Sequence, residues 1–204
     1  MAMDEEALIS EAQNGSLDSF NSLVLKYQDM AFNLAARMLG DEDAAADVTQ
    51  VAFISAYRSL DSFRGGSFRA WVMRMVSNAC YDELRRRKRR PTISLEPVNE
   101  DDEEIESPAW LADSSASPEE EMERVELDQA LQTCLSGLPE EFRSVVLMVD
   151  IEGFDYQEVS VAIGKPLGTV KSRLARARLK MRECLRNYRE LLPSIFRLGD
   201  EVTP

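Results

Sequence analysis

Basic side chains gather on one segment near the end of the chain, in a pattern suited to reading duplex DNA. Residues 156–184 read YQEVSVAIGKPLGTVKSRLARARLKMREC, which predicts a short amphipathic helix, a turn containing glycine and a second helix. The major groove of B-DNA admits one helix, and the first turns of that helix reach base edges. Off the apolar stripe of the second helix lie Lys171, Ser172, Arg173, Arg176, Arg178 and Lys180. The alternative interpretation is a basic helix that is only solvated.

A second segment combines aromatic and basic residues. Residues 62–90 read SFRGGSFRAWVMRMVSNACYDELRRRKRR. Side chains that track phosphates, beside rings that stack on bases, are typical of single-stranded nucleic acid binding. The alternative is structural, with Phe68 and Trp71 packed in a core and the basic run at 85–90 forming a solvated helix end. The composition favours nucleic acid over that alternative.

Other chemistries are poorly supported. The chain has no histidine, which removes His-based nucleophile activation and most zinc and haem sites. Gly164 and Lys165 are not part of a phosphate-binding loop, because the glycine required five residues earlier is Val159. The acids between 41 and 47 indicate a helix N-terminus rather than a metal site. We therefore expect no enzyme activity, no cofactor and no metal.

The cysteines are few and widely separated. They are Cys80, Cys134 and Cys184. An odd number without a CxxC pair argues against a disulfide scaffold or a zinc ribbon and fits a reducing cytosol.

The net charge of −13 hides a block pattern. Residues 1–57 carry 10 acids and 2 bases, and residues 91–123 carry 12 acids and no base. Residues 58–90 carry 10 bases and 3 acids, and residues 165–189 carry 9 bases and 1 acid. Two compact basic segments therefore lie within an acidic chain. Because phosphate attraction dominates non-specific DNA binding, the acidic total is expected to suppress binding to arbitrary DNA.

Helices must position these segments, since apolar residues recur at spacings of three and four along most of the chain. Ser16 is suited to an N-cap and Gly40 to the left-handed position after a helix. The helix that follows Gly40 has an apolar side, formed by Val48, Val51, Phe53, Ile54 and Tyr57. The predicted helices span about 4–13, 17–39, 41–60, 67–90, 118–137, 139–153, 155–164 and 169–192.

The pattern predicts an all-α protein with two small helical domains joined by a flexible acidic linker, the second domain containing the helix-turn-helix. The linker, 91–118, contains four prolines and the run EDDEEIE, a composition that cannot bury enough apolar surface to offset ordering. The domains are then 1–90 and 119–192, and a tail of unknown role spans 193–204.

No segment is predicted to enter a membrane. The longest apolar run, VVLMV at 145–149, is far short of the roughly 20 residues that span a bilayer. The acidic N-terminus lacks the basic and apolar regions of a signal peptide. We expect a cytoplasmic location.

Taken together, in this order and separation, the two halves resemble a bacterial RNA polymerase sigma factor of the extracytoplasmic-function (ECF) group. The resemblance covers about residues 5–190. It is carried by DEDAAADVTQVAFISAYRSLDSFRGGSFRAWVMRMVSNACYDELRRRKRR in the first half and by LPEEFRSVVLMVDIEGFDYQEVSVAIGKPLGTVKSRLARARLKMRECL in the second. It implies a protein that binds core RNA polymerase, melts and reads the −10 promoter element with its first domain and reads the −35 duplex with its second.

The resemblance also implies three sets of site residues. Core-polymerase binding falls on Asp43, Asp47, Gln50 and Phe53. Binding of the −10 element falls on Phe63, Arg64, Ser67, Phe68, Trp71, Arg74 and Asn78. Binding of the −35 element falls on Thr169, Lys171, Ser172, Arg173 and Arg176. The implied partners are core RNA polymerase and promoter DNA, and an anti-sigma factor is common in the group.

Three positions depart from the family's pattern. The FRGGSF loop is one residue shorter than is frequent, and Val51 stands where a glutamate often follows the clamp-binding glutamine. Ser160 stands where alanine is usual, and its hydroxyl either back-bonds to a carbonyl or contacts phosphate. The competing function is a stand-alone regulator that binds duplex DNA as a dimer, which would share the helix-turn-helix but would not need the FRGGSFRAW segment or the acidic linker.

Overall fold

The computed structural model describes residues 4–89 and 118–192, and the regular elements of both ranges are helical. For residues 118–121 it describes the backbone alone. The predicted flexible linker lies outside the described residues except for Pro118, and so does the tail at 193–204.

The first half begins with α1 (Glu5–Gln13), α2 (Leu17–Leu39) and α3 (Glu42–Ser59). Capping residues close in the sequence set the ends of α2 and the start of α3. The Ser16 hydroxyl accepts a hydrogen bond from the amide of Ser19, and Gly40 adopts a φ of 66° after α2. Asp41 caps α3 by accepting from the Ala44 amide at 2.9 Å. A 3₁₀ turn (Leu60–Ser62) then leads to α4 (Phe68–Arg89).

The second half contains α5 (Pro118–Ser136), α6 (Glu140–Val146), α7 (Tyr156–Ile163) and α8 (Leu167–Leu185). The helix predicted at 139–153 is not α-helical throughout, because it widens into a π-helical turn at Leu147–Ile151. The last helix begins two residues before the predicted Thr169 and tightens to a 3₁₀ helix at Arg186–Leu191.

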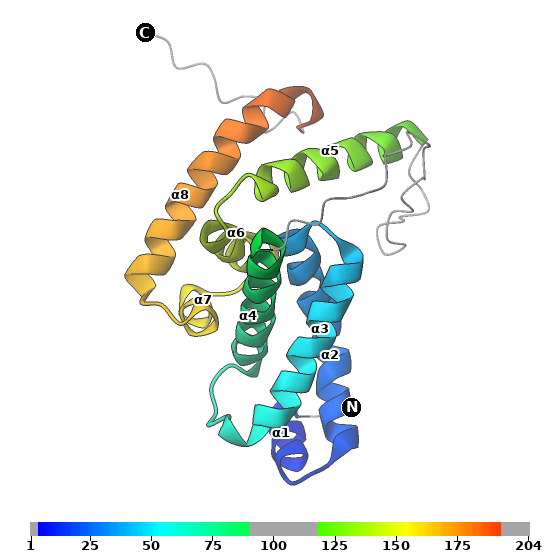
Figure 1. The fold of residues 1–204 in the computed structure, drawn as a ribbon, viewed down its shortest axis with the longest axis vertical. Coiled ribbons are helices and arrows are strands. Elements are labelled where there is room, and N and C mark those ends of the chain that lie inside the picture. The colour runs from blue at the N-terminus through cyan, green and yellow to red at the C-terminus, as the bar shows by residue number, and fades with distance from the viewer. Residues whose placement is uncertain (1–3, 90–117, 193–204) are drawn as a thin grey trace.

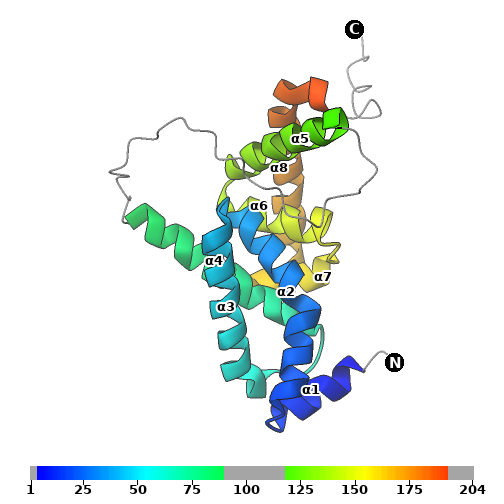
Figure 2. The ribbon, with the colours of Figure 1, turned by 90° about the vertical axis from the view of Figure 1, so that its right-hand side faces the viewer.

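The two halves pack against one another around a shared core. Figure 1 shows α4 running between α7 on one side and α2 and α3 on the other. In both views α1 lies at one end of the molecule and α5 at the other (Figure 2). Buried apolar residues from α2, α4, α6, α7 and α8 belong to one continuous cluster. The sequence predicted two helical domains, and the structure adds an extensive contact between them.

A buried arginine forms hydrogen bonds across this contact. Arg143 on α6 is 7% exposed, and its guanidinium donates hydrogen bonds to three carbonyl oxygens. One belongs to Met38 in the last turn of α2, and the others belong to Ser136 at the end of α5 and to Leu138 in the turn before α6. The Tyr81 hydroxyl of α4 lies 2.7 Å from that of Ser144 on α6. Polar groups of the second half thus satisfy buried groups of the first.

The cysteines differ from the sequence prediction, since two of them form a disulfide. Cys134 of α5 is bonded to Cys184 in the last turn of α8, with their Cα atoms 5.7 Å apart. The prediction was wrong because 50 residues of sequence hide the contact between the two helices that carry these residues. Cys80 is a buried free thiol, and burial raises its pKa to about 12, which keeps it protonated and unreactive.

Reducing this disulfide is expected to destabilise the second half. A cross-link that closes a loop of about 50 residues contributes roughly 2–4 kcal/mol, chiefly by restricting the unfolded chain. Denaturant unfolding followed by circular dichroism, with and without dithiothreitol, measures the difference. A Cys80→Ala protein is the control and should respond to reductant in the same way. Superimposable curves for oxidised and reduced protein would contradict the expectation.

Candidate nucleic-acid interface

The helix-turn-helix is built by strong local signals at the ends of its first helix. Asp155 accepts hydrogen bonds from the amides of Gln157 and Glu158, and the Glu158 carboxylate accepts from the Asp155 amide, so that α7 starts with a capping box. Gly164 ends α7 with a φ of 62°. The Ser160 hydroxyl donates to the carbonyl oxygen of Lys165 at 2.6 Å, five residues ahead in the turn, instead of back-bonding within its own helix.

The second helix, α8, presents a polar face opposite a buried stripe. Val170 and Leu174 are buried in this stripe, while Lys171, Ser172 and Arg176 are exposed. These exposed residues lie in the first three turns of α8, where a recognition helix contacts base edges.

Two further members of the −35 set are less accessible. Thr169 and Arg173 are half-buried, and the Arg173 guanidinium donates to Glu141 of α6 at 2.6 Å. Arg173 is therefore an ion-paired cation in the free protein, whereas Lys171 and Arg176 have no ion pair among the described residues.

The loop before α4 packs more deeply than the sequence suggests. Phe63 is 8% exposed, and its ring centroid lies 5.4 Å from that of Phe68 and 5.3 Å from that of Trp71. Phe68 is itself only 1% exposed. The Phe63 ring therefore closes over the start of α4, although two glycines follow closely in the sequence.

The remaining members of the −10 set share one surface. Arg64, Arg74 and Asn78 are exposed, and Ser67 and Trp71 are half-buried. Because Trp71 presents the accessible part of the aromatic cluster, it is better placed than Phe63 to meet an unpaired base.

This surface is partly covered by α7. Glu158 accepts hydrogen bonds from the Ser67 hydroxyl at 2.7 Å and from the Arg69 guanidinium at 2.5 Å. The same guanidinium lies over the ring of Phe154, 4.0 Å from its centroid. Burial opposes ionisation of Glu158, but the bonds from Arg69 and Ser67 outweigh it and lower the pKa. The carboxylate is therefore charged at neutral pH.

The basic run at the end of α4 is largely neutralised within the chain. Two acids pair with two of its six bases: Glu83 pairs with Arg86 and Arg87, and Asp41 pairs with Arg87. Hydrogen bonds from Arg86 and Arg87 outweigh the opposing effect of burial and lower the pKa of Glu83 to about 2. The run therefore presents less free positive charge to nucleic acid than its composition suggests. Two more pairs are Arg85 with Asp82 and Lys88 with Glu140.

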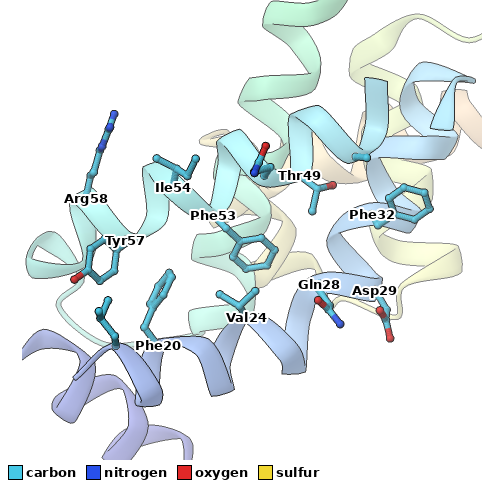
Figure 3. Close-up of a pocket in the computed structure, with 13 residues that line it drawn as sticks. Phe20, Val24, Gln28, Asp29, Phe32, Thr49, Phe53, Ile54, Tyr57 and Arg58 are labelled. Carbon is cyan, nitrogen blue, oxygen red and sulfur yellow. The ribbon is translucent and has the colours of Figure 1, made fainter. Parts of the chain in front are cut away.

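An apolar groove of about 880 Å³ runs between α2 and α3 (Figure 3). Phe20 and Tyr57 face one another at one end, with ring centroids 5.0 Å apart. Phe53 points across the groove toward Val24 (Figure 3). Among the exposed apolar residues of α3 is Ile54, at 45%. Exposed apolar surface of this extent marks an interaction site.

The described residues include neither a cluster of metal ligands nor a membrane-spanning helix. Residues 4–89 and 118–192 contain no group of three or more Cys, Asp or Glu arranged to hold a metal ion. None of the helices in these ranges has the length and apolarity needed to cross a bilayer.

Comparisons with known proteins agree with this layout. Residues 23–90 match the family described as Sigma-70 region 2, and residues 128–181 match Sigma-70, region 4. The chain is 38% identical to RNA polymerase sigma-H factor of Pseudomonas aeruginosa, over 85% of this chain and 90% of that one. It is 37% identical to ECF RNA polymerase sigma-E factor of Escherichia coli strain K12, over 86% of this chain and 91% of that one.

The chain belongs to the ECF sigma factors. It directs RNA polymerase to promoters in transcription initiation, and its partners are RNA polymerase and DNA. A sigma factor is not an enzyme, and family membership decides against the stand-alone regulator. The fold also resembles that of CnrH in its complex with the cytosolic domain of CnrY, with a TM-score of 0.64 and 25% identity over 90% of this chain and 97% of that one.

The predicted polymerase-binding residues of this sigma factor all lie on α3. Asp43, Asp47 and Gln50 are exposed, whereas Phe53 is 8% exposed and lines the groove with Gln50. Sequence reasoning missed the part of the groove that α2 supplies, which is Leu17, Phe20, Val24, Gln28, Asp29 and Phe32. The available signal was the apolar side of α3, which includes Ile54 and Tyr57, two exposed residues that line the groove.

Sequence reasoning also missed the contact between Arg69 and Glu158. Glu158 follows Asp155 by three residues, which is a capping pattern and carries no information about a partner in the other domain. Only the packing of α4 against α7 brings the two side chains together.

Proposed function

We propose that this ECF sigma factor contacts core polymerase through α3 and the α2–α3 groove, the melted −10 strand through the start of α4, and the −35 duplex through α8. The corresponding domains are residues 1–90 and 119–192. The observation that carries the proposal is the polar face of α8, where Lys171, Ser172 and Arg176 are exposed opposite a buried stripe. That division of faces is what insertion of one helix into a major groove requires.

The polymerase contact is supported by the chemistry of the groove. Acids of α3, Asp43 and Asp47, are exposed beside an apolar groove that Gln50 and Phe53 line. Apolar surface bordered by charge suits a helical partner with an apolar face and basic flanks.

The free protein is proposed to be a resting form. Promoter positions −35 and −10 are separated by roughly 85 Å of duplex, at about 3.4 Å per base pair. In the free protein Glu158 of the helix-turn-helix is in hydrogen-bond contact with Ser67 and Arg69 beside the −10 surface. The two domains must therefore separate before both elements are read, and core polymerase is the partner that holds them apart.

Arg176→Ala is expected to weaken −35 recognition. A bidentate arginine–base contact contributes about 1–3 kcal/mol of discrimination, so transcription from a native promoter should fall while that from a −35-substituted promoter changes little. In vitro transcription with core polymerase on both templates measures the ratio. The exposed Lys180 gives the control variant Lys180→Ala. A ratio equal to that of the wild type would refute a base-reading role for Arg176.

Glu158→Gln is expected to release the resting form. The change removes a charge-assisted contact, and the free protein should bind −35 duplex about tenfold more tightly by fluorescence anisotropy. Arg69→Gln on the other domain should give the same increase, although it removes a cation. The exposed Glu126 supplies the control variant Glu126→Gln. If Arg69→Gln weakens binding, the contact does not restrain the protein.

Transcription with purified core polymerase tests the proposal as a whole. Start sites mapped on a genomic fragment library should share one −35 and one −10 sequence, and neither core nor the protein alone should produce these transcripts. A gel shift of the shared sequence should require both components. Specific binding by the protein alone, at the affinity seen with polymerase, would contradict the proposed division of labour.

We also propose a cytoplasmic location and an inhibitory protein partner of the anti-sigma type. Support for the partner is the fold similarity to CnrH, whose solved structure contains the cytosolic domain of CnrY. Co-purification of the tagged sigma factor from its native cells, followed by a transcription assay with the captured protein, tests this partner.

A further inference from the structure

One side chain of α1 reaches across to the loop that precedes α4. The Gln13 amide nitrogen donates hydrogen bonds to the carbonyl oxygens of Leu60 and Phe63, both at 3.0 Å. These two carbonyls bracket the 3₁₀ turn at 60–62. An amide NH₂ group has two hydrogens, so both donors of Gln13 are committed to this turn.

The turn is the base of the FRGG loop. After Phe63 the chain continues through exposed Arg64 to Gly65 and Gly66, whose φ values are 95° and 91°. A loop with two glycines in the left-handed region has little stiffness of its own. Its direction is therefore set where it leaves the packed structure, which is at the Phe63 carbonyl that Gln13 holds.

Helix α1 is a firm support for Gln13. Leu8, Ile9 and Ala12 are buried in the core, and Glu11 accepts a hydrogen bond from the Ser19 hydroxyl at 2.5 Å. Figure 1 shows α1 beside the turn between α3 and α4, at the end of the molecule away from α5. The helix precedes residue 23, where the match to Sigma-70 region 2 begins.

We infer that Gln13 is a positioning residue for capture of the −10 strand. It holds the base of the loop so that Arg64 and the accessible part of Trp71 meet the unpaired bases. The inference rests on the proposed function of this loop.

Gln13→Glu tests the inference, because a carboxylate places acceptors against the two carbonyl acceptors. Transcription from a duplex promoter is expected to fall about tenfold, which corresponds to the loss of one to two net hydrogen bonds. A template with a pre-melted −10 region should recover most of that loss. Gln13→Lys keeps a donor within reach of both carbonyls and should retain most duplex activity. The exposed Glu6 on the same helix gives the control Glu6→Gln, which should behave as wild type.

Tryptophan fluorescence distinguishes a local effect of Gln13 on the loop from a general loss of structure. The chain has two tryptophans, so in a Trp110→Phe background the emission reports on Trp71, whose ring lies 5.3 Å from that of Phe63. Gln13→Glu should shift this emission while polymerase affinity stays at the wild-type value. An unchanged spectrum, or equal losses on duplex and pre-melted templates, would overturn the inference.

Arg64→Ala, assayed in parallel, distinguishes failure of the inference about Gln13 from failure of the −10 assignment of the loop. If Arg64→Ala shows a duplex-specific loss and Gln13→Glu does not, the inference about Gln13 fails while the −10 assignment stands. If neither variant distinguishes the templates, the loop does not act in strand separation and both assignments fail.

Discussion

Replacing Phe63 with alanine is expected to destabilise the first domain by about 3–5 kcal/mol, the usual cost of truncating a buried aromatic residue. Phe63 is 8% exposed and packs edge-on against Phe68 and at a tilt against Trp71, so the truncation leaves a cavity at the start of α4. Denaturant unfolding followed by circular dichroism measures the loss. Phe63→Leu fills much of the same volume and should cost less than about 1.5 kcal/mol.

The neighbouring residue provides the control for Phe63. Arg64 is exposed, and Arg64→Ala should leave the free energy of unfolding within about 0.5 kcal/mol of the wild-type value. Transcription by Phe63→Ala has to be compared at a temperature where the variant is folded. If Phe63→Ala is as stable as the wild type, the Phe63 ring does not stabilise the domain by packing. A role of the ring in base capture is then favoured.

The second large effect is expected from Arg143→Met, which keeps an apolar stem and removes the guanidinium. Three carbonyl oxygens, those of Met38, Ser136 and Leu138, lose their donor. Buried acceptors left without a partner cost about 1–3 kcal/mol each, part of which is offset because a buried charge is also removed. We expect a net loss of about 3 kcal/mol, measured by denaturant unfolding of the full chain.

Because one of these carbonyls belongs to α2, Arg143→Met should also loosen the contact between the domains. Small-angle scattering of the free variant under folding conditions is expected to give a larger radius of gyration than that of the wild type. Arg124 is exposed on α5, and Arg124→Met is the control that should change neither stability nor size. An unchanged radius for Arg143→Met would show that the other contacts suffice to hold the domains together.

Helix ends were predictable from sequence because the groups that set them are close along the chain. Ser16 caps the amide of Ser19, and Asp41 caps that of Ala44, each three residues ahead. Gly164 ends α7 because only glycine adopts a φ of 62° without strain. The π-helical turn after Val146 was not predictable, since no local signal distinguishes it from a continuing α-helix.

Contacts between distant residues were hidden for a different reason. Periodicity shows that a residue is apolar and on a given face, but it does not show what covers that face. Ile54 and Tyr57 extend the apolar side of α3 in the sequence, yet they line an open groove. Phe63 shows the opposite error, because its neighbours Gly65 and Gly66 suggest a loop while its ring is buried.

The contacts between the two domains also set how tightly polymerase binds the sigma factor. If polymerase engages only the separated form, its apparent dissociation constant is the intrinsic one divided by the separated fraction. Each 1.4 kcal/mol that the Glu158–Arg69 and Arg143 contacts add to closure lowers that fraction about tenfold. Substitutions at the contacts between the two domains would therefore change transcription from every promoter of the regulon by one common factor. The cell could tune a sigma factor's share of a limited polymerase pool there, while the residues that read DNA stay the same.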